Sequence, residues 1–532
     1  MKWRTLEAGK ISVQYCGTLS AAETVVKFLR ETSSDLPTLA RKLGEIPEHY
    51  AVVGRTSTVT CAVVDHIRSV PIFWRYTERD SGPLVGPDAH ILRTSGPMKP
   101  FASNELCEVA MTGYVTGPNT LISGLSQLEA GEVRYWQHHL GTTENAFSYR
   151  HWPSNEFQLS SGSEYEQLSG AINASFARTM NFAGTRPILV PLSGGLDSRL
   201  VLGKLVEQGY SPLHAFSYGP PNNPDAETAR LVADRLGVQW RHVQTPTTRC
   251  RAFFDSDILK RYWDFSDGLC CTPNHQDLLP LITLTETGEV PEDSILVNGQ
   301  SGDFITGGHI PDAFNTEATV NTNLLIEEII AKHYGLWKNL MTSKNLLHAR
   351  KKISACLDMP ETPNDISATQ AAALYELWEY KERQAKYVVN GQRIYDFLGM
   401  DWSLPLWDRE FTTFWRDTNV SHKYKQSLYC TWLQQWNYRG IFTDIGNTIT
   451  AWPRVASSIL ACAAIAMRLV TGRKRRDQIF RYLNYFDRFG DHYKIFGFHS
   501  FWKHAQNFRN PTSMYTKAWL EYHGVSLDSL VH

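Results

Sequence analysis

The sequence predicts an α/β protein with two parts, an N-terminal α+β part over residues 1–150 and a doubly wound parallel sheet with a helical C-terminal part over residues 181–532. The main observation is that apolar runs alternate with amphipathic stretches between residues 188 and 243, in a β-α-β-α-β order typical of parallel sheets. The second is that helical spacing with many aromatic residues continues from about residue 320. Residues 151–180 are predicted to be a linker and a lead-in helix, with the helix over Tyr165–Thr179.

The composition is that of an ordinary globular protein. Of 532 residues, 42% are hydrophobic and 20% charged, which leaves room for two to four domains. The net charge of -1 provides no global field for nucleic acid, so no nucleic-acid partner is expected. Nine scattered cysteines without a CxxC pair favour a reducing compartment. The first residues lack the apolar core of a signal peptide, so we expect a cytoplasmic location.

Short apolar or alternating runs predict strands in the first part. These runs are Ile11–Tyr15, Tyr50–Gly54, Val59–Val64, Pro71–Tyr76 and Glu132–Trp136. Amphipathic spacing predicts two helices, over Ser20–Thr32 and Leu36–Leu43. The first part contains no sequence cluster typical of a metal site and no nucleophile motif.

A strand, a polar loop and a helix follow one another from Ile188, in a stretch that begins I-L-V-P-L-S-G-G-L-D-S-R-L. The loop is expected over Ser193–Ser198 and the helix over Arg199–Gln208. Glycines let the backbone approach an anion, serine hydroxyls donate hydrogen bonds, and a helix N-terminus adds partial positive charge. We therefore expect a phosphate site here, although a glycine-rich turn without a ligand is the alternative. A carboxylate beside a phosphate needs a cation between them, so Asp197 is a predicted Mg²⁺ ligand. The predicted phosphate-binding residues are Leu192, Ser193, Gly194, Gly195, Leu196, Asp197 and Ser198, and Arg199 could also reach a phosphate.

The S-G-G-x-D-S pattern resembles the pyrophosphate loop of the N-type ATP pyrophosphatases and lacks the G-K-[ST] ending of a Walker loop. The later segments Phe216–Gly219 and Asp225–Gly237 extend the resemblance to the synthetase domain of asparagine synthetase. That family cleaves ATP between its α and β phosphates, so ATP and Mg²⁺ are the implied cofactors. The resemblance also implies that Phe216, Ser217 and Tyr218 lie near adenine, with stacking by Tyr218 or ordinary strand roles as alternatives.

A second glycine-rich loop follows the apolar run that starts at Ser294. Its sequence N-G-Q-S-G-D-F-I-T-G-G looks like the family's G-E-G-S-D-E-x-F-G-G segment. The aspartate is kept as Asp303, which implies that Asp197 and Asp303 together hold Mg²⁺. Asn298 and Gly299 complete the predicted ATP-binding set. Gln300 and Phe304 replace two acidic residues of the family pattern. The sequence therefore departs from the family at the end of the site that binds the carboxylate substrate.

The first part also resembles the same family. The segments Asp65–Phe73 and Thr116–Glu132 are similar to two segments of the glutaminase domain of asparagine synthetase. A working glutaminase of this type has an N-terminal cysteine as its nucleophile. This chain begins Met1-Lys2 and lacks the family's glutamine clamp, so we expect a degenerate Ntn-type domain without glutaminase activity. Cys16 could mimic the nucleophile only after removal of fifteen residues, and a strand residue is the favoured interpretation.

The C-terminal part extends the resemblance through Glu379–Asn390, Asp396–Gly399 and Leu404–Phe411. These segments are most similar to asparagine-synthetase-like proteins associated with bacterial surface polysaccharides. In the family a C-terminal lysine stabilises charge on the reacting phosphorus, and Lys425 and Lys494 are the candidates. Simple solvent exposure is the alternative for each lysine.

An apolar stretch, Val455–Met467, precedes a basic cluster at Arg473–Arg476. The stretch is too short to span a bilayer, which favours a buried helix with a solvated basic end. The alternative is a peripheral contact with anionic lipid.

The resemblance implies an AMP-forming, ATP-dependent ligase that adenylates a carboxylate and transfers ammonia or an amine to it. The carboxylate could be aspartate or a uronic acid of a glycan, and an internal amine would make the protein a cyclase. A non-catalytic ATP-binding scaffold is the alternative from another class, supported by Gln300 and Phe304. A tRNA-modifying enzyme is disfavoured by the neutral charge. The oligomeric state is not predicted.

Overall fold

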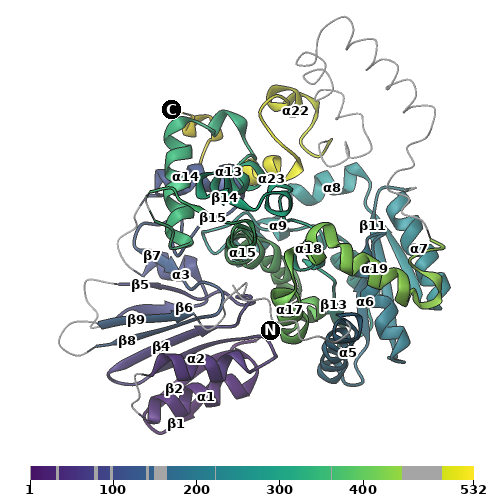
Figure 1. The fold of residues 1–532 in the computed structure, drawn as a ribbon, viewed down its shortest axis with the longest axis horizontal. Helices are drawn as coiled ribbons and strands as arrows, with labels where there is room; N and C mark the ends of the chain where they lie inside the picture. Colours follow the sequence, from purple (N-terminus) through teal and green to yellow (C-terminus); the bar gives the residue numbers. More distant parts are fainter. Residues whose placement is uncertain are drawn as a thin grey trace, which may run out of the picture.

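The computed structural model describes residues 2–31, 35–76, 82–95, 100–138, 143–148, 164–221, 223–360, 362–445 and 494–531. An antiparallel region and a parallel-sheet region lie on opposite sides of a group of helices (Figure 1). The predicted apolar stretch Val455–Met467, the basic cluster Arg473–Arg476 and the first part of the predicted linker lie outside the described residues. No helix in the described ranges is long and apolar enough to cross a membrane.

The antiparallel region contains two sheets. In the larger sheet every neighbouring pair is antiparallel, in the order β1 (Arg4–Ala8), β2 (Ile11–Gly17), β3 (Tyr50–Arg55), β4 (Val59–Val64), β8 (Glu132–Gln137) and β9 (Thr143–Ser148). The smaller sheet has the order β6 (Leu84–Gly86), β5 (Phe73–Arg75) and β7 (Leu125–Gln127). The region also contains the helices α1 (Leu19–Arg30), α2 (Leu36–Gly44), α3 (Ala89–Thr94) and α4 (Ser103–Thr112).

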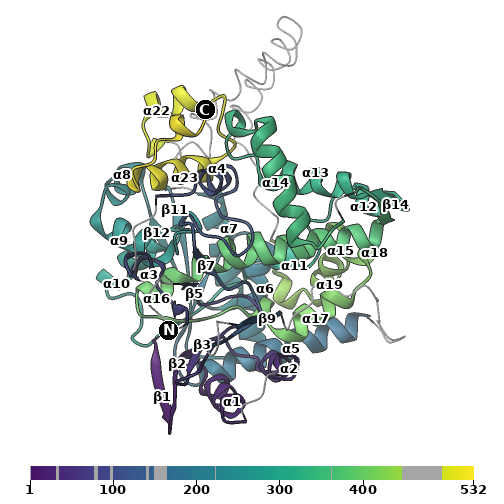
Figure 2. The ribbon, with the colours of Figure 1, turned by 90° about the vertical axis from the view of Figure 1, so that its left-hand side faces the viewer.

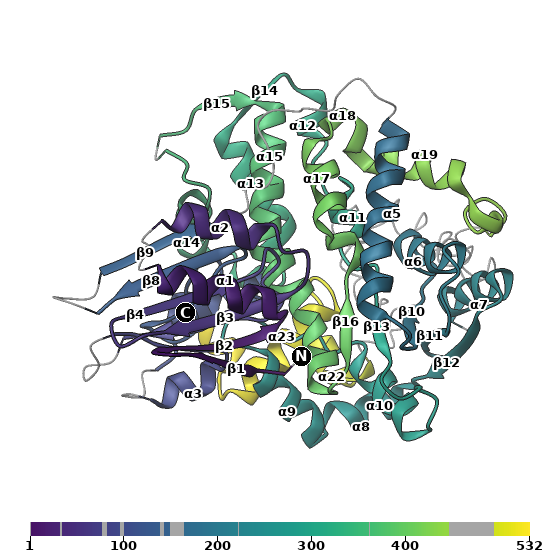
Figure 3. The ribbon, with the colours of Figure 1, turned by 90° about the horizontal axis from the view of Figure 1, so that it is seen from below.

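Alternation along the strands places this larger sheet between two apolar layers. Val52 and Val63 belong to the core that it forms with α1 and α2, which cover one face of the sheet (Figure 3). Their neighbours Val53 and Val64 point the other way and pack with residues of the smaller sheet. The strands predicted from alternation are present, whereas β1 was missed because its edge position leaves Arg4, Thr5 and Glu7 exposed.

The second region is built on a parallel sheet with the order β12 (Gln239–Gln244), β11 (Leu213–Gly219), β10 (Ile188–Pro191), β13 (Ile295–Val297) and β16 (Asp401–Ser403). The chain builds the sheet outward from β10 in one direction and then from β13 in the other. The strand order therefore reverses between β10 and β13. In open α/β sheets ligands bind beyond the carboxyl ends of the strands at such a reversal. Both predicted loops lie there, because they directly follow these two strands.

Two predicted helices start earlier than expected. The lead-in helix α5 covers Glu164–Ala183. The helix predicted from Arg199 is α6 (Leu196–Glu207), so Asp197 and Ser198 lie in its first turn and not in the loop. The sequence hid this start because Gly195, which precedes the helix, makes no side-chain cap hydrogen bond.

The remaining helices surround the sheet and fill the space between the two regions (Figures 1 and 2). They are α7 (Pro224–Leu236), α8 (Thr247–Phe254), α9 (Asp257–Ser266), α10 (Leu278–Glu286), α11 (Gly302–Ile305), α12 (Ala313–Thr316), α13 (Thr322–His333), α14 (Ser343–Cys356), α15 (Ala368–Glu379), α16 (Arg393–Phe397), α17 (Arg409–Asp417), α18 (Val420–Lys423), α19 (Ser427–Trp436), α22 (Phe498–His504) and α23 (Pro511–Tyr522). Two short strands, β14 (Thr319–Asn321) and β15 (Asp365–Ser367), pair antiparallel. A π-helix, η2 (Tyr380–Val388), continues α15. Short 3₁₀ helices are η1 (Lys338–Leu340), η3 (Val389–Gln392), η4 (Pro405–Trp407), η5 (Tyr424–Gln426), η6 (Tyr438–Gly440) and η9 (Leu527–Leu530).

Buried polar contacts join the two regions. The backbone N–H of Gly117 donates to Glu382 Oε2 at 2.9 Å, and Lys386 Nζ donates to Gly117 O at 2.7 Å. Lys386 and Glu382, one turn apart in η2, also form a fully buried ion pair at 2.6 Å. A buried pair is stable only with such additional hydrogen bonds, so the segment around Gly117 completes the environment of these two charges.

Candidate active site at the ends of the parallel strands

The loops after β10 and β13 meet at Asp197. A Cβ atom added to Gly302 would overlap the Asp197 carboxylate, and one at Gly299 would come within 2.8 Å of the Asp197 backbone. Glycine at both positions therefore lets the second loop pass directly over the first. The fold thus brings the two predicted metal ligands, Asp197 and Asp303, together from separate loops.

The environment of Asp197 is unfavourable for its charge. Burial and the neighbouring Asp303 carboxylate raise the pKa of Asp197 to about 7. A hydrogen bond that Tyr429 Oη donates to Asp197 at 2.8 Å acts to lower this pKa but does not outweigh them. The described residues include no lysine or arginine in an ion pair with either aspartate. Asp197 has no cationic partner among the described residues, and carboxylate oxygens from two loops suit a hard divalent ion, so this pair of side chains fits Mg²⁺.

Asp303 is held from its other side by the partly buried His309, which in turn contacts the buried Glu379. His309 Nε2 lies 3.1 Å from Asp303 Oδ2, and His309 Nδ1 lies 2.5 Å from Glu379 Oε1. Burial lowers the pKa of His309, but both carboxylates outweigh it and raise the pKa to about 9. Partial desolvation acts to raise the pKa of the Asp303 carboxylate, and the contact with His309 outweighs it and holds that pKa below its usual value. Asp303 is thus kept as an oriented carboxylate.

The loop of the first motif is closed by its own side chains. Ser198 Oγ lies 2.9 Å from Ser193 Oγ and accepts from Ser193 N at 3.1 Å. Gly194 N donates to Asp225 Oδ1 at 2.9 Å, and a Cβ at Gly194 would lie 2.7 Å from that oxygen. Because Gly195 caps α6 without a side chain, the first turn of this helix keeps its partial positive charge facing the loop.

Arg199 is hydrogen-bonded through its guanidinium group to backbone carbonyl groups. Its side chain is 1% exposed and donates to Gly194 O at 2.7 Å and to Ile441 O and Ile445 O at 3.0 Å. The guanidinium therefore braces the loop against the segment that follows α19. To reach a phosphate, as the sequence suggested, Arg199 would have to leave these carbonyl groups.

The predicted adenine side lies along β11. Phe216 is 1% exposed, and its carbonyl oxygen accepts from Leu192 N at 2.8 Å. Ser217 Oγ donates to Leu192 O at 2.6 Å. Tyr218 is only partly buried, and its ring centroid lies 6.4 Å from that of Phe216. Of the three side chains, Tyr218 is therefore the one open to a stacking contact.

A polar network that the sequence did not reveal connects β11 with β13. Tyr395 Oη donates to Asp277 Oδ2 at 2.7 Å and lies 3.1 Å from Asn298 Nδ2, which donates to it. Asp277 is also hydrogen-bonded to Tyr218, and its burial raises its pKa. The network thus fixes Asn298 and Tyr218 relative to each other across the place where the strand order reverses.

The two candidate lysines differ in position. Lys425 is 65% exposed and pairs with Asp312 at 3.3 Å, on a segment that packs against the second loop. A Cβ at Gly308 would lie 3.1 Å from Gln426 Cγ, which shows how close that segment comes. Lys494 lies beside α8, where its carbonyl accepts from Arg251 at 2.6 Å. Lys425 therefore lies on a segment that contacts the loop that carries Asp303.

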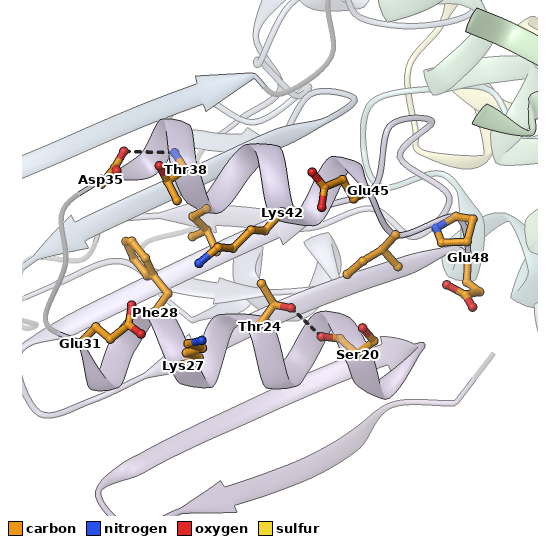
Figure 4. Close-up of a pocket in the computed structure, with 13 residues that line it drawn as sticks. Ser20, Thr24, Lys27, Phe28, Glu31, Asp35, Thr38, Lys42, Glu45 and Glu48 are labelled. Carbon is orange, nitrogen blue, oxygen red and sulfur yellow. Dashed lines mark hydrogen bonds between the residues drawn. The ribbon is translucent and has the colours of Figure 1, made fainter. Parts of the chain in front are cut away.

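The antiparallel region contains a cavity of about 550 Å³ between α1 and α2 (Figure 4). Its lining mixes Lys27 and Lys42 with Glu31 and Glu45, and it contains none of the predicted site residues. Cys16 lies elsewhere, 1% exposed within β2, and burial raises the pKa of its thiol to about 11. A buried thiol of raised pKa is unsuited to nucleophilic attack, in agreement with the strand interpretation.

The chain is also similar to known proteins. A family model described as asparagine synthase matches residues 167–445, just over half of the chain and all five strands of the parallel sheet. The fold and the paired loops thus define an ATP-dependent amide-forming ligase in the general sense of that family. The chain belongs to the asparagine synthase family.

No curated protein matches the chain. Among solved structures, the chain is similar to a glutamine phosphoribosylpyrophosphate amidotransferase from B. subtilis complexed with ADP and GMP, at 10% identity. That match covers 47% of this chain and 75% of the other, with a TM-score of 0.16, so it carries no argument about the fold.

The sequence did not single out four residues that contact the site: His309, Glu379, Tyr429 and Asp277. Glu379 fell inside a segment noted only for its resemblance, and Tyr429 and Asp277 carried no motif at all. His309 directly follows the double glycine of the second loop, which is the signal that could have found it. The others approach the site only through helix packing, which local spacing does not encode.

Proposed function

We propose that the protein is an AMP-forming ligase that adenylates a carboxylate and transfers ammonia or an amine to it. The observation that carries the proposal is the meeting of Asp197 and Asp303 at the strand-order reversal, beside an uncapped helix N-terminus. Such a place suits a triphosphate held through a divalent cation. The acceptor would be a small-molecule or glycan carboxylate, and the resemblance to surface-polysaccharide proteins favours a uronic acid.

The reaction would proceed in two balanced steps. A carboxylate oxygen of the acceptor attacks the α-phosphorus of ATP, and the bond to pyrophosphate breaks, which leaves an acyl-AMP. The nitrogen of ammonia or an amine then attacks the acyl carbon, AMP leaves, and the nitrogen gives up a proton. Bound Mg²⁺ would supply charge neutralisation on the triphosphate.

The protein's own groups have separate tasks in this scheme. Gly194, Gly195 and the first turn of α6 would bind the phosphates, while Asp197 and Asp303 would hold Mg²⁺. His309 orients Asp303 through its contact at 3.1 Å. Lys425 would neutralise charge on the reacting phosphorus after its exposed side chain turns from Asp312.

We also propose the domain roles that the sequence suggested. Residues 1–150 would be a degenerate glutaminase-like domain, 151–180 a linker with its lead-in helix, and 181–532 the ATP pyrophosphatase part. The buried Cys16 and the helix–sheet–sheet layering of the first region support this division. Ammonia or an amine would then come from solution or from a partner and not from glutamine.

The test is product analysis with the full-length protein. Purified protein is incubated with ATP, Mg²⁺ and ammonium, together with separate pools of amino acids and uronic acids. The proposal expects AMP and pyrophosphate in amounts that depend on one carboxylate. ADP as product would overturn the adenylation mechanism. ATP binding without turnover across the pools, including lipid-linked uronic acids, would favour the non-catalytic scaffold.

A further inference from the structure

A second cluster of metal-ligating side chains lies far from the loops, where three helices meet. His90 lies on α3, Asp264 lies on α9, and Asp267 directly follows α9. One ligand atom from each of the three side chains lies within 4.8 Å of the other two. His90 Nε2 is 2.8 Å from Asp267 Oδ1. Figure 2 shows α3 beside α9, at the junction between the antiparallel region and the rest of the chain.

The carboxylates of this cluster are oriented by hydrogen bonds from a third helix, α23. Trp519 Nε1 donates to Asp267 Oδ2 at 3.2 Å, and His523 Nε2 lies 2.9 Å from the same oxygen. Tyr522 Oη donates to Asp264 Oδ2 at 2.8 Å. Metal-binding carboxylates in proteins are held by outer partners of this kind, which fix their direction.

The charge in the cluster is not balanced by a permanent cation. Asp267 is fully buried, and within the described part of the chain its ion pairs are with histidines alone, His90 and His523. Asp264 likewise has no ion pair with lysine or arginine among the described residues. Two carboxylates that face imidazole groups without a lysine or arginine partner are a donor set that a metal ion can bind.

We propose that His90, Asp264 and Asp267 bind a divalent transition-metal ion of the zinc class. Imidazole nitrogen and carboxylate oxygen are both ligands of Zn²⁺, and three protein ligands leave a further position for water. Asp264 is exposed and the His90 side chain is 29% exposed, so an ion can enter from solvent.

The existing distances need only a small adjustment. Ligand atoms around a tetrahedral Zn²⁺ stand about 3.3 Å apart, about 0.5 Å more than the gap between His90 Nε2 and Asp267 Oδ1. His90 lies on the short helix α3 and can make that movement. The bound ion would fasten the antiparallel region to α9, with α23 holding the ligands in place. This site is independent of the proposed ligase activity.

The test measures metal binding by the full-length protein after treatment with a chelator. Co²⁺ is titrated by visible absorbance and Zn²⁺ by calorimetry, for wild type, His90→Ala and Asp264→Asn. We expect one ion at this site, with affinity at least about tenfold lower in either variant. Asp303→Asn serves to separate this ion from one bound at the nucleotide loops, and it should leave the site unaffected.

His422→Ala is the matched control, because His422 forms an exposed pair with Glu164 at 2.7 Å that has no second carboxylate. Zn²⁺ should raise the Tm of wild type and of this control, and should not raise the Tm of His90→Ala or Asp264→Asn. Asp264 is exposed, so its asparagine variant should fold even if the histidine variant does not. The proposal would be overturned if Zn²⁺ and Co²⁺ did not bind, or if they bound equally well to wild type and Asp264→Asn. Protonated histidines would then be what offsets the charge of the two carboxylates.

Discussion

Two aspartates, one in each region, show how differently the same side chain is treated in this protein. Asp65 follows β4 in the antiparallel region, is fully buried, and accepts hydrogen bonds from the backbone N–H groups of Tyr50, Ile67 and Ser69 at 2.9 to 3.1 Å. Asp197 follows β10 and faces Asp303, so its pKa rises to about 7. The first carboxylate is satisfied by the fold, whereas the second is left in need of a cation.

A buried lysine at the junction of the two regions makes the same contrast with Asp197. Lys386 is placed at the junction of the regions, where it neutralises Glu382 and bonds to two backbone carbonyls. The loops that carry Asp197 and Asp303 have no such lysine among the described residues. A satisfied buried charge indicates a structural role, and an unsatisfied pair of like charges indicates a binding site. The following predictions test that distinction.

The largest effect is expected from Asp303→Asn. Loss of one carboxylate removes half of the predicted metal site, so carboxylate-dependent formation of AMP should fall about a thousandfold. The thermal stability should change little, because the Asp303 side chain is 59% exposed. Asp257→Asn is the control, since Asp257 is a 96% exposed carboxylate on α9. Unchanged AMP formation in Asp303→Asn would contradict the metal assignment.

Asp65→Ala should affect stability instead. The change leaves several buried N–H groups without an acceptor, at a cost of about 3 kcal/mol in the free energy of unfolding. Urea unfolding followed by tryptophan fluorescence would measure the loss. Activity per folded molecule should be preserved, and its selective loss would show that the antiparallel region takes part in the chemistry.

Gly302→Ala tests how closely the two loops meet. The added methyl group would overlap the Asp197 carboxylate and push the aspartates apart, so activity should fall about a hundredfold and need more Mg²⁺. Gly170→Ala is the matched control, because a Cβ at Gly170 in α5 meets no atom within 4 Å. Equal activity of both variants would show that Asp197 is not confined by Gly302.

Asp197→Asn should stabilise the metal-free protein at neutral and higher pH. The pKa of Asp197 is about 7 in the folded protein and about 3.9 when unfolded, so ionisation opposes folding. Its stability penalty is absent below about pH 4, grows between pH 4 and 7, and is complete above that. A pKa difference of about 3 corresponds to about 4 kcal/mol, so we expect a gain of that order at pH 8 and none at pH 4, measured by urea unfolding at both pH values. A gain of equal size at both would exclude titration of Asp197 as the cause.

Much of the fold was predictable because its signals are local. Alternation identified β2, β3, β4 and β8, and the strand–loop–helix pattern located the loop around Ser193. Short edge strands such as β1 and β9 lack a buried face and therefore carry no such pattern. The start of α6 was misplaced because glycine at the cap gives no polar signal.

The sequence by itself determined the residue types that the site needs, since the S-G-G-L-D-S loop and Asp303 stand in recognisable local patterns. Only the tertiary structure decided their partners. The contact of His309 with Glu379, and that of His90 with Asp267, join residues far apart in the chain. Such pairs depend on strand order and helix packing, which arise from the burial of whole faces and not from any local spacing.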